Sequence, residues 1–502
     1  MAYLMGVDLG TQSVKAMIMD GHGEVKGTAS ESYELSIPKP GYAEQSPDTW
    51  HDASAAAIRR AAEASGVSPG AIEAVSFSGQ MHGLVCVDGE GKPLRDAMLW
   101  LDQRAKGAIA QIYDKLGAEF VAANVQNTIS AGFLIGSLYW MYLNEPELYG
   151  RIKHVMLPKD YVKFRLTGRV VTDYSDAAGS AAFDNVKLRW ALPLIEGLGL
   201  DAGMFPEALP STEVIGTVTA AAARDTSLTK GTKIVNGGGD QFMQGIGNGI
   251  TDEGFYAGNI GTAGQVSACS ARPVYDKLLR TNTFAHAIPG RWNVMGACLT
   301  SGVSLKWFAR SILGINNFAD VDREAAKLKP GSEGLIFLPY LSGERTPHLD
   351  ASARGMFCGL TLGHGKYHMA RAVMEGVTYS LRDCMELLAG MGIPCECVVA
   401  SGGGANSAVW MQMQADVLGR EVRKSRVSEQ ACVGAAITAG VGAGIYPGYQ
   451  EACREVVKFE DRIFSPMREN AEAYGEHYEI FRELYAANRS SFEKLGALSG
   501  VR

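Results

Sequence analysis

The stretch Gly237-Gly238-Gly239-Asp240-Gln241, near the midpoint of the chain, constrains the fold more than any other. Residues 232–236 before it have the apolar character of a buried strand, and a helical pattern starts at Gln241. Three glycines allow a turn and a close backbone approach that residues with a Cβ would resist. We therefore expect Asp240 where a strand ends and a helix begins. Two roles stay open: an N-cap for the free amides of that helix, or a carboxylate that faces a ligand.

A second constraint is an internal repeat. Asp8-Leu9-Gly10-Thr11 matches Asn259-Ile260-Gly261-Thr262 half a chain later, and each follows an apolar strand and precedes an alternating one. The chain begins as an antiparallel meander with predicted strands at 3–8, 14–19 and 24–30. Together with a length of 502 residues, the repeat predicts two similar large halves. The glycine-rich passage 245–254 is then the expected hinge.

Four turns at strand ends have the composition of ligand-binding loops. They lie at 8–13, 237–241, 258–264 and 401–406. Free amides at a helix start and small hydroxylated turns offer donors to phosphate groups. Four such turns, two of them related by the repeat, indicate a nucleotide whose phosphates lie between two lobes. The chain has no Walker A sequence and no dinucleotide-binding fingerprint in its proper context, which excludes a P-loop and disfavours a dinucleotide fold.

Two further groups follow predicted strands. Asp8 suits Mg²⁺, which binds through few carboxylates and retained waters; the alternative is an aspartate that hydrogen-bonds its own turn. Gln80, Met81 and His82 follow the strand at 74–77 and combine a donor, a soft apolar side chain and an imidazole, which suits contact with a small polyol. The alternative for His82 is a structural histidine with satisfied hydrogen bonds.

Composition narrows the class of protein. The net charge is −7, the pI is near 5.8 and no run of Lys or Arg stands out, so we expect no nucleic-acid partner. No apolar run reaches the length of a membrane span, the N-terminus lacks a signal-peptide pattern, and the nine cysteines are scattered. We therefore expect a cytoplasmic protein without a membrane partner. A homodimer is the default expectation, because symmetric dimers are the commonest soluble oligomers.

The sequence resembles the FGGY family of carbohydrate kinases, most closely its xylulokinase members. The resemblance runs from Gly6 to about residue 450, and the motifs that carry it are Ser78-Gly-Gln-Met-His-Gly83, Leu157-Pro-Lys-Asp-Tyr161, Thr172-Asp-Tyr-Ser-Asp-Ala-Ala-Gly179, Gly237-Gly-Gly-Asp-Gln241, Leu338-Pro-Tyr-Leu-Ser-Gly-Glu-Arg-Thr-Pro-His348 and Ser401-Gly-Gly-Gly-Ala-Asn406. It implies an α/β fold of two duplicated actin-like (ribonuclease H-like) ATPase domains around a central cleft. Residues 1–249 would form the sugar-binding domain and 250–502 the ATP-binding domain.

The resemblance also implies ATP-dependent phosphorylation of a sugar, D-xylulose before others, with MgATP as co-substrate. Asp240 falls on the general-base position, and Met81, His82 and Gln241 fall on sugar-contacting positions, which the residue pattern extends to Gln80. Asp8 falls on the Mg²⁺-linked position. The ATP positions are Thr11 and Gln12 in the first phosphate turn, Gly261 and Thr262 in the second, and Gly402, Gly403, Gly404 and Asn406 around the adenosine.

Three departures from the xylulokinase pattern matter. Gln241 replaces a usual Asn, Gly136-Ser137 stands where many members have Pro-Lys, and Ala431-Cys432 replaces a common Pro-Ala beside the nucleotide site. The first two leave the sugar open, so another ketose or polyol (ribulose, gluconate, glycerol or erythritol) is the alternative substrate, while the third concerns adenine packing. A non-enzymatic actin-like nucleotide switch is the alternative of another class. It would need the phosphate turns but not the sugar-facing residues Gln80, Met81 and His82.

Overall fold

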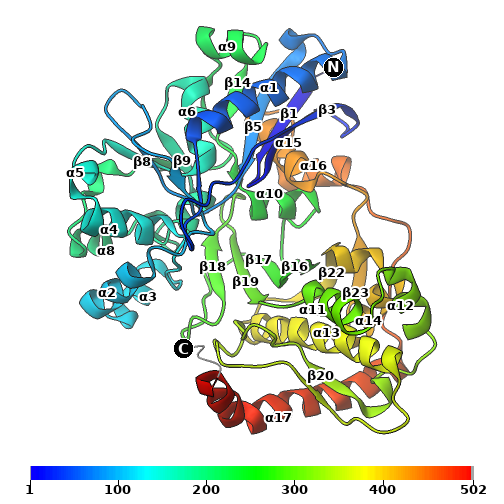
Figure 1. Ribbon diagram of the computed structural model, residues 1–502. Coiled ribbons are helices and arrows are strands. Elements are labelled where there is room, and N and C mark those ends of the chain that lie inside the picture. Colours follow the sequence, from blue (N-terminus) through cyan, green and yellow to red (C-terminus); the bar gives the residue numbers. More distant parts are fainter. Residues whose placement is uncertain (1, 499–502) are drawn as a thin grey trace.

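Two mixed β-sheets dominate the computed structural model, which describes residues 2–498 (Figure 1). The first sheet has the strand order β13-β14-β5-β1-β2-β3 and the second the order β18-β19-β17-β16-β22-β23. The strands of the first sheet are β1 (Tyr3–Leu9), β2 (Ser13–Asp20), β3 (Val25–Ser32), β5 (Ile72–Gly79), β13 (Val214–Thr217) and β14 (Lys233–Val235). Those of the second are β16 (Gly254–Ile260), β17 (Gly264–Ser270), β18 (Asn282–Ala285), β19 (Trp292–Cys298), β22 (Cys395–Gly402) and β23 (Glu421–Lys424).

The two sheets repeat one topology. β1 runs antiparallel to β2 and parallel to β5, and β16 runs antiparallel to β17 and parallel to β22. The registers also agree, because Asp8 lies opposite Ser78 while Asn259 lies opposite Ser401. The duplication predicted from a four-residue match is therefore confirmed, and with it the α/β fold of two similar halves.

Helices cover both sheets. α1 (Pro47–Ser65) packs on β2 and β3, and α13 (Lys366–Gly390) packs on β17 and β19. One stripe of α13 faces the core, since Val373, Val377, Leu381 and Met385 are all buried. α14 (Ala408–Leu418) packs against α13, and the long α17 (Arg468–Leu498), at the bottom of Figure 1, packs against both. No helix in the described range 2–498 combines the length and the apolar character that a membrane span requires.

Between β5 and β14 the chain builds a mostly helical insertion with a core of its own. Its helices are α2 (Lys106–Leu116), α3 (Ala118–Val125), α4 (Leu134–Asn144), α5 (Pro146–Tyr149), α6 (Pro158–Thr167), α7 (Tyr174–Gly179), α8 (Leu192–Gly197) and α9 (Ala220–Thr226). Short strands accompany them, among them β9 (Val171–Asp173). Two of these helices, α6 and α7, reach the end of the first sheet and bear on the site.

Two helices make backbone contact at the centre of the molecule. α10 (Asp240–Gly247) crosses α15 (Gln430–Gly442), and a Cβ on Gly247 would lie 1.9 Å from the Gln430 carbonyl oxygen. A Cβ on Gly434 would likewise lie 1.9 Å from the carbonyl oxygen of Met243. α15 also packs against β1 and β5, so a helix from the second half of the sequence covers the first sheet.

Candidate functional site

Three neighbouring strands of the first sheet end together. Asp8 on β1 lies opposite Ser78 on β5, and Ser78 lies opposite Gly238 of the short strand β15 (Gly238–Gly239). The carboxyl ends of parallel strands meet at one edge of a sheet, as expected for α/β ligand sites. The register therefore places Asp8 and the Asp240 turn side by side.

Asp240 is the first residue of α10, and Gly239 is the N-cap. Of the two roles left open for Asp240, the N-cap is therefore excluded. Gly239 has the extended backbone (φ −60°, ψ 149°) that an N-cap needs, so the helix begins one residue earlier than an Asp cap would require. The Asp240 carboxylate accepts a bond from the amide of Gln241 (2.7 Å) and stays partly exposed, so it faces outward from the turn.

The electrostatics of the two carboxylates are coupled. Burial and, to a smaller extent, the negative charge of Asp8 raise the pKa of Asp240 to about 7, while the bond from the Gln241 amide opposes this shift. Burial also raises the pKa of Asp8, against the Ser78 hydroxyl and the charge of Lys15. Two close carboxylate groups at the mouth of a turn are a donor set that suits Mg²⁺.

Asp8 does not hydrogen-bond its own turn, so that alternative is wrong. Its Oδ1 accepts a bond from Ser78 Oγ (2.6 Å), a residue seventy positions away on the next strand. The neighbouring cation, Lys15, pairs with Glu429 (2.7 Å) directly before α15. Asp8 is thus oriented by the sheet and leaves its turn free.

His82 is held by one backbone contact and by ring stacking, and it keeps one ring nitrogen as an acceptor. Its backbone has φ +74°, its Nδ1 lies 2.6 Å from the Gly179 carbonyl oxygen, and its ring stacks on Phe133 with centroids 4.0 Å apart. Burial lowers the pKa of His82 to about 4, so the ring is neutral at physiological pH. A ring nitrogen beside a carbonyl oxygen must donate, so Nδ1 carries the proton and Nε2 remains an acceptor. That acceptor suits a substrate hydroxyl.

The other residues predicted to contact sugar have different surroundings. Met81 is buried and packs against Gly239. A Cβ added to Gly239 would lie 2.7 Å from the Cγ of Met81. Gln80 is buried too, and its Oε1 accepts from Thr11 Oγ1 (3.2 Å), so it braces the first turn. Gln241 is partly exposed, and its Nε2 lies 3.0 Å from the sulfur of Met295 on β19. Gln241 thus spans from the first sheet to the second.

The predicted phosphate turns lie at equivalent places in the two sheets. In the first, the Thr11 carbonyl accepts from Gln45 Nε2 (2.7 Å), while Gln12 is exposed. In the second, the carbonyls of Gly261 and Thr262 accept from the amides of Gly302 (2.8 Å) and Ser301 (3.1 Å), where α11 (Gly302–Trp307) begins. The Thr262 side chain is exposed.

The 401–406 loop lies beside the second turn. Gly402 has φ +75°, and a Cβ there would lie 2.4 Å from Asn259 Oδ1, so only glycine fits. A short 3₁₀ turn (Gly403–Asn406) comes before α14, whose N-cap is Ser407. Gly403 and Asn406 are exposed, whereas Gly404 packs on Ile260. The structure therefore brings the predicted ATP residues of the second half together.

Two residues of the site were not predicted. Trp100 is 45% exposed, and its indole Nε1 donates to Thr11 Oγ1 (3.1 Å). Arg345 donates to Asn282 Oδ1 (3.2 Å), and its charge helps to lower the pKa of His82. Arg345 lies inside the 338–348 motif, so the sequence pattern could have identified it as a candidate site residue. Trp100 lies in a loop whose partner is far away in sequence, so no local pattern identified it.

The substituted motif positions fall at different places. Gly136 and Ser137 are buried in α4, three residues beyond the Phe133 ring that stacks on His82. Cys432 lies in α15 against β1, where its carbonyl oxygen would be 1.9 Å from a Cβ on Gly6. This places the Ala431-Cys432 substitution next to the strand that carries Asp8, and its effect on adenine packing stays a prediction.

Residues 3–247 match the N-terminal domain of the FGGY family of carbohydrate kinases, and residues 257–443 match its C-terminal domain. A xylulose kinase of Lactococcus lactis subsp. lactis is 35% identical over 486 residues, covering 97% of each chain. A gluconokinase of Bacillus subtilis is 29% identical and covers 96% of this chain and 95% of that protein. The crystal structure of xylulose kinase from Rhodospirillum rubrum superposes with a TM-score of 0.93 at 30% identity, covering 98% of this chain and 100% of that one.

Proposed function

Because this chain belongs to the FGGY family of carbohydrate kinases, we propose that it transfers the γ-phosphoryl group of ATP to the terminal hydroxyl of D-xylulose, giving D-xylulose 5-phosphate. The observation that carries the proposal is Asp240, a partly exposed carboxylate at the end of the first sheet with its pKa near 7. A group of this pKa is half ionised near neutral pH, which suits a general base.

Asp240 would accept the proton of the sugar hydroxyl as that oxygen attacks phosphorus. Phosphoryl transfer requires positioning and charge neutralisation more than covalent chemistry by the protein. His82 Nε2, as an acceptor, and Gln241, as a donor, would bind other hydroxyls and hold the attacking oxygen near Asp240. Met81 would supply an apolar wall beneath the carbon chain.

The nucleotide would lie on the second half, with its phosphates between the Gly10-Thr11 and Gly261-Thr262 turns. Gly402, Gly403, Gly404 and Asn406 would border the adenosine, and exposed backbone there permits close approach. Asp8 would hold Mg²⁺, which neutralises phosphate charge when bound. We assign the sugar domain to 1–249, the ATP domain to 250–502, and the enzyme to the cytoplasm, where ATP is available; a homodimer stays a prediction.

The experiment is an ADP-release screen with MgATP over pentuloses, gluconate, glycerol and erythritol. We expect D-xylulose to give the highest kcat/KM. The Asp240→Asn variant should lose about 10²–10⁴-fold in kcat, the usual contribution of a positioned general base. A control is Asp201→Asn, since Asp201 only caps a short helix far along the chain. Near-normal turnover by a folded Asp240→Asn variant would overturn the role of Asp240.

A second sugar has one specific observation in its favour. Gln241 is one methylene longer than the Asn of the xylulokinase pattern and reaches Met295, which changes the space beside Asp240. A gluconokinase is also among the relatives. If gluconate or another polyol surpasses xylulose in the screen, the family assignment holds and the sugar assignment is replaced.

A further inference from the structure

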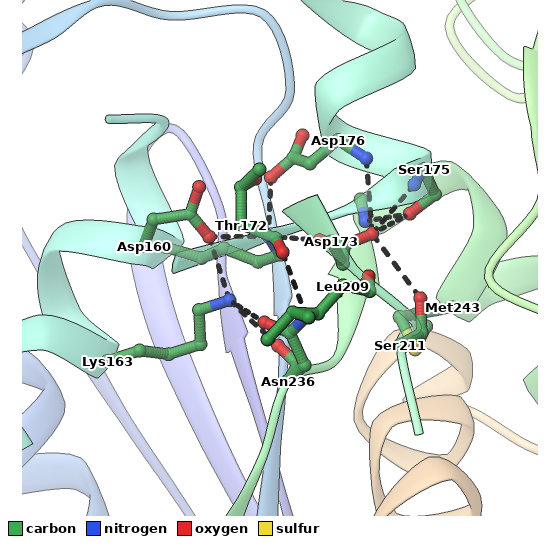
Figure 2. Close-up of polar contacts among 12 residues, drawn as sticks. Asp160, Lys163, Thr172, Asp173, Ser175, Asp176, Leu209, Ser211, Asn236 and Met243 are labelled. Carbon is green, nitrogen blue, oxygen red and sulfur yellow. Dashed lines mark hydrogen bonds and ion pairs between the residues drawn. The ribbon is translucent and has the colours of Figure 1, made fainter. Parts of the chain in front are cut away.

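A cluster of five charged side chains lies completely buried behind the site. Lys159, Asp160 and Lys163 come from α6, and Asp173 and Asp176 flank the start of α7; none is more than 1% exposed. Figure 2 shows Asp160, Asp173 and Asp176 converging between these helices, with Lys163 and Asn236 below them. None of these charged groups is among the residues assigned to the sugar, the nucleotide or Mg²⁺, so the proposed chemistry leaves the cluster without a role.

The carboxylates of Asp160, Asp173 and Asp176 lie close enough together to hold a metal ion, but the ammonium group of a lysine lies between them. Lys159 Nζ lies 2.9 Å from Asp160, 2.5 Å from Asp173 and 2.7 Å from Asp176. Since the ammonium group already contacts one oxygen of each carboxylate, it does what a cation would do there. The cluster is thus an ion network and not a metal site.

The charges of the network balance. Two lysines face three aspartates, which leaves one negative charge in excess when all five groups are ionised. Burial raises the pKa of Asp176 to about 8, against Lys159 and with the charges of Asp173 and Asp160. A proton therefore stays on Asp176 near pH 7, and the network carries no net charge into the protein interior. Such a balance is needed because an unpaired buried charge is costly.

The network is bonded to the backbone before the Asp240 turn and within it. Before the turn, Lys163 Nζ donates to the Asn236 carbonyl (3.0 Å) and to its side-chain oxygen (2.5 Å). Within the turn, the amide of Gly239 donates to Ser175 Oγ (3.2 Å), and Ser175 in turn donates to Asp173. Gly239 is the residue directly before Asp240. Figure 2 shows Ser175 beside Asp173 and Asn236 beside Lys163.

We propose that Lys159, Lys163, Asp160, Asp173 and Asp176 form a positioning network that fixes the direction of the Asp240 carboxylate through Ser175 and Asn236. Glycines 237–239 make the turn flexible by themselves, because they have no side chains that could lock their backbone. The network adds to the pairing of β15 with β5 by holding one backbone group before the turn and the Gly239 amide directly before Asp240. This proposal depends on the proposed function, since it concerns the direction of the general base.

The test targets Ser175, because Lys159→Met would leave buried carboxylates unpaired and risk unfolding. Ser175→Ala removes one hydroxyl, leaves all five charges and frees the Gly239 amide. We expect kcat with the best sugar to fall about tenfold, at the lower end of the 10–100-fold typical of orienting partners. The KM for the sugar should stay within about twofold, because no substrate contact changes.

The matched control is Ser180→Ala. Ser180 lies one residue beyond α7, is equally buried, and its hydroxyl bonds only the local Ala177 and Ala182 backbone. We expect its kcat to equal that of the wild type, with thermal melting points of both variants within a few degrees. A double-mutant cycle adds the decisive readout: in the Asp240→Asn background, Ser175→Ala should cause no further loss of kcat.

The outcomes separate two failures. If the wild type is active and Ser175→Ala behaves as Ser180→Ala does, the positioning proposal is overturned alone. The same holds if Ser175→Ala slows the Asp240→Asn variant as strongly as it slows the wild type, because the loss would not act through Asp240. A wild type inactive toward every sugar overturns the proposed function and this proposal with it.

Discussion

The turn after β1 and the turn after β16 have the same backbone setting but different supports. In the first, side chains hold the turn: Gln80 and Trp100 bond Thr11, and Tyr33 bonds the Gly10 carbonyl. In the second, the backbone amides at the start of α11 hold the Gly261 and Thr262 carbonyls. The first turn is therefore held by side chains, whereas the second is held by backbone amides.

The residues at matching register positions differ in charge. Asp8 is a carboxylate beside Asp240, whereas Asn259 is an uncharged amide whose buried Oδ1 has no hydrogen-bond partner among residues 2–498. One copy of the duplicated unit thus carries the carboxylates that we propose for Mg²⁺ and for the general base. The other has an uncharged, glycine-lined turn, which we propose for the nucleotide. The two copies have the same strand arrangement and differ in single side chains at the strand ends, such as Asp8 and Asn259.

The substitution Asp8→Asn removes the difference in charge between the two turns, because it gives the first turn the asparagine that the second has at Asn259. Of the variants that compare the two turns, we expect the largest effect from this one. We expect the Mg²⁺ concentration for half-maximal activity to rise about 10–100-fold, the range for weakened metal sites. A Mg²⁺ titration at saturating ATP and sugar measures this. Asp88→Asn is the control, since Asp88 only accepts amides of its own exposed turn, from Glu90 and Lys92 (both 2.9 Å). Equal Mg²⁺ titrations for the two variants would remove Asp8 from the metal site.

The pH dependence sharpens the comparison, because only the first turn adjoins a titrating base. Asp240 must lose its proton to act, so kcat/KM should fall about tenfold per unit below pH 7. A pH–rate profile measures this, and a flat profile between pH 5.5 and 7 would count against Asp240.

The same shift has a consequence for stability. The pKa of Asp240 is about 7 in the folded protein and about 3.9 in the unfolded chain. The contribution of Asp240 to the free energy of unfolding is therefore full below about pH 3.9 and is lost as the pH rises through about 7. Asp240→Asn should therefore raise the melting temperature relative to wild type more at pH 8 than at pH 5.

The smallest predicted effect concerns the second turn. Gly402→Ala places a methyl group against Asn259 and Ile260 at positive φ, which costs about 1–3 kcal/mol in strain, or several degrees in melting temperature. Gly419→Ala is the control, since its φ is also positive (+62°) but no atom lies within 4 Å of the added methyl. We expect only Gly402→Ala to raise the KM for ATP. If both variants behave alike, backbone strain rather than the nucleotide surface explains Gly402.

Sequence patterns predicted most of the strands and turns around the site, because strands and glycine turns have local patterns and each copy of the repeat is itself a short local motif. The strands at 3–8 and 232–236 and the helix after Asp240 all lie where expected. The side-chain directions were not predictable. The side chain of Gln80 bonds Thr11, and no local pattern indicates this, because the partner lies in a hairpin 69 residues earlier.

The buried network was beyond sequence analysis for the same reason. Leu157-Pro-Lys-Asp-Tyr161 and Thr172-Asp-Tyr-Ser-Asp were visible as motifs, but nothing local shows that Lys159 meets Asp173 and Asp176. The N-cap alternative for Asp240 is excluded by a single residue, and only the backbone angles of Gly239 decide that position.

The contact of α10 with α15 has a consequence for variation in this chain. Gly247 and Gly434 let two backbones touch, and α10 begins at the proposed base itself. A single methyl group at either glycine would push one helix away from the other and tilt everything attached to it. Substitutions at these two positions would thus shift the proposed base relative to the first sheet while every ligand-facing side chain kept its identity, so an inactive natural variant need carry no change in the site at all.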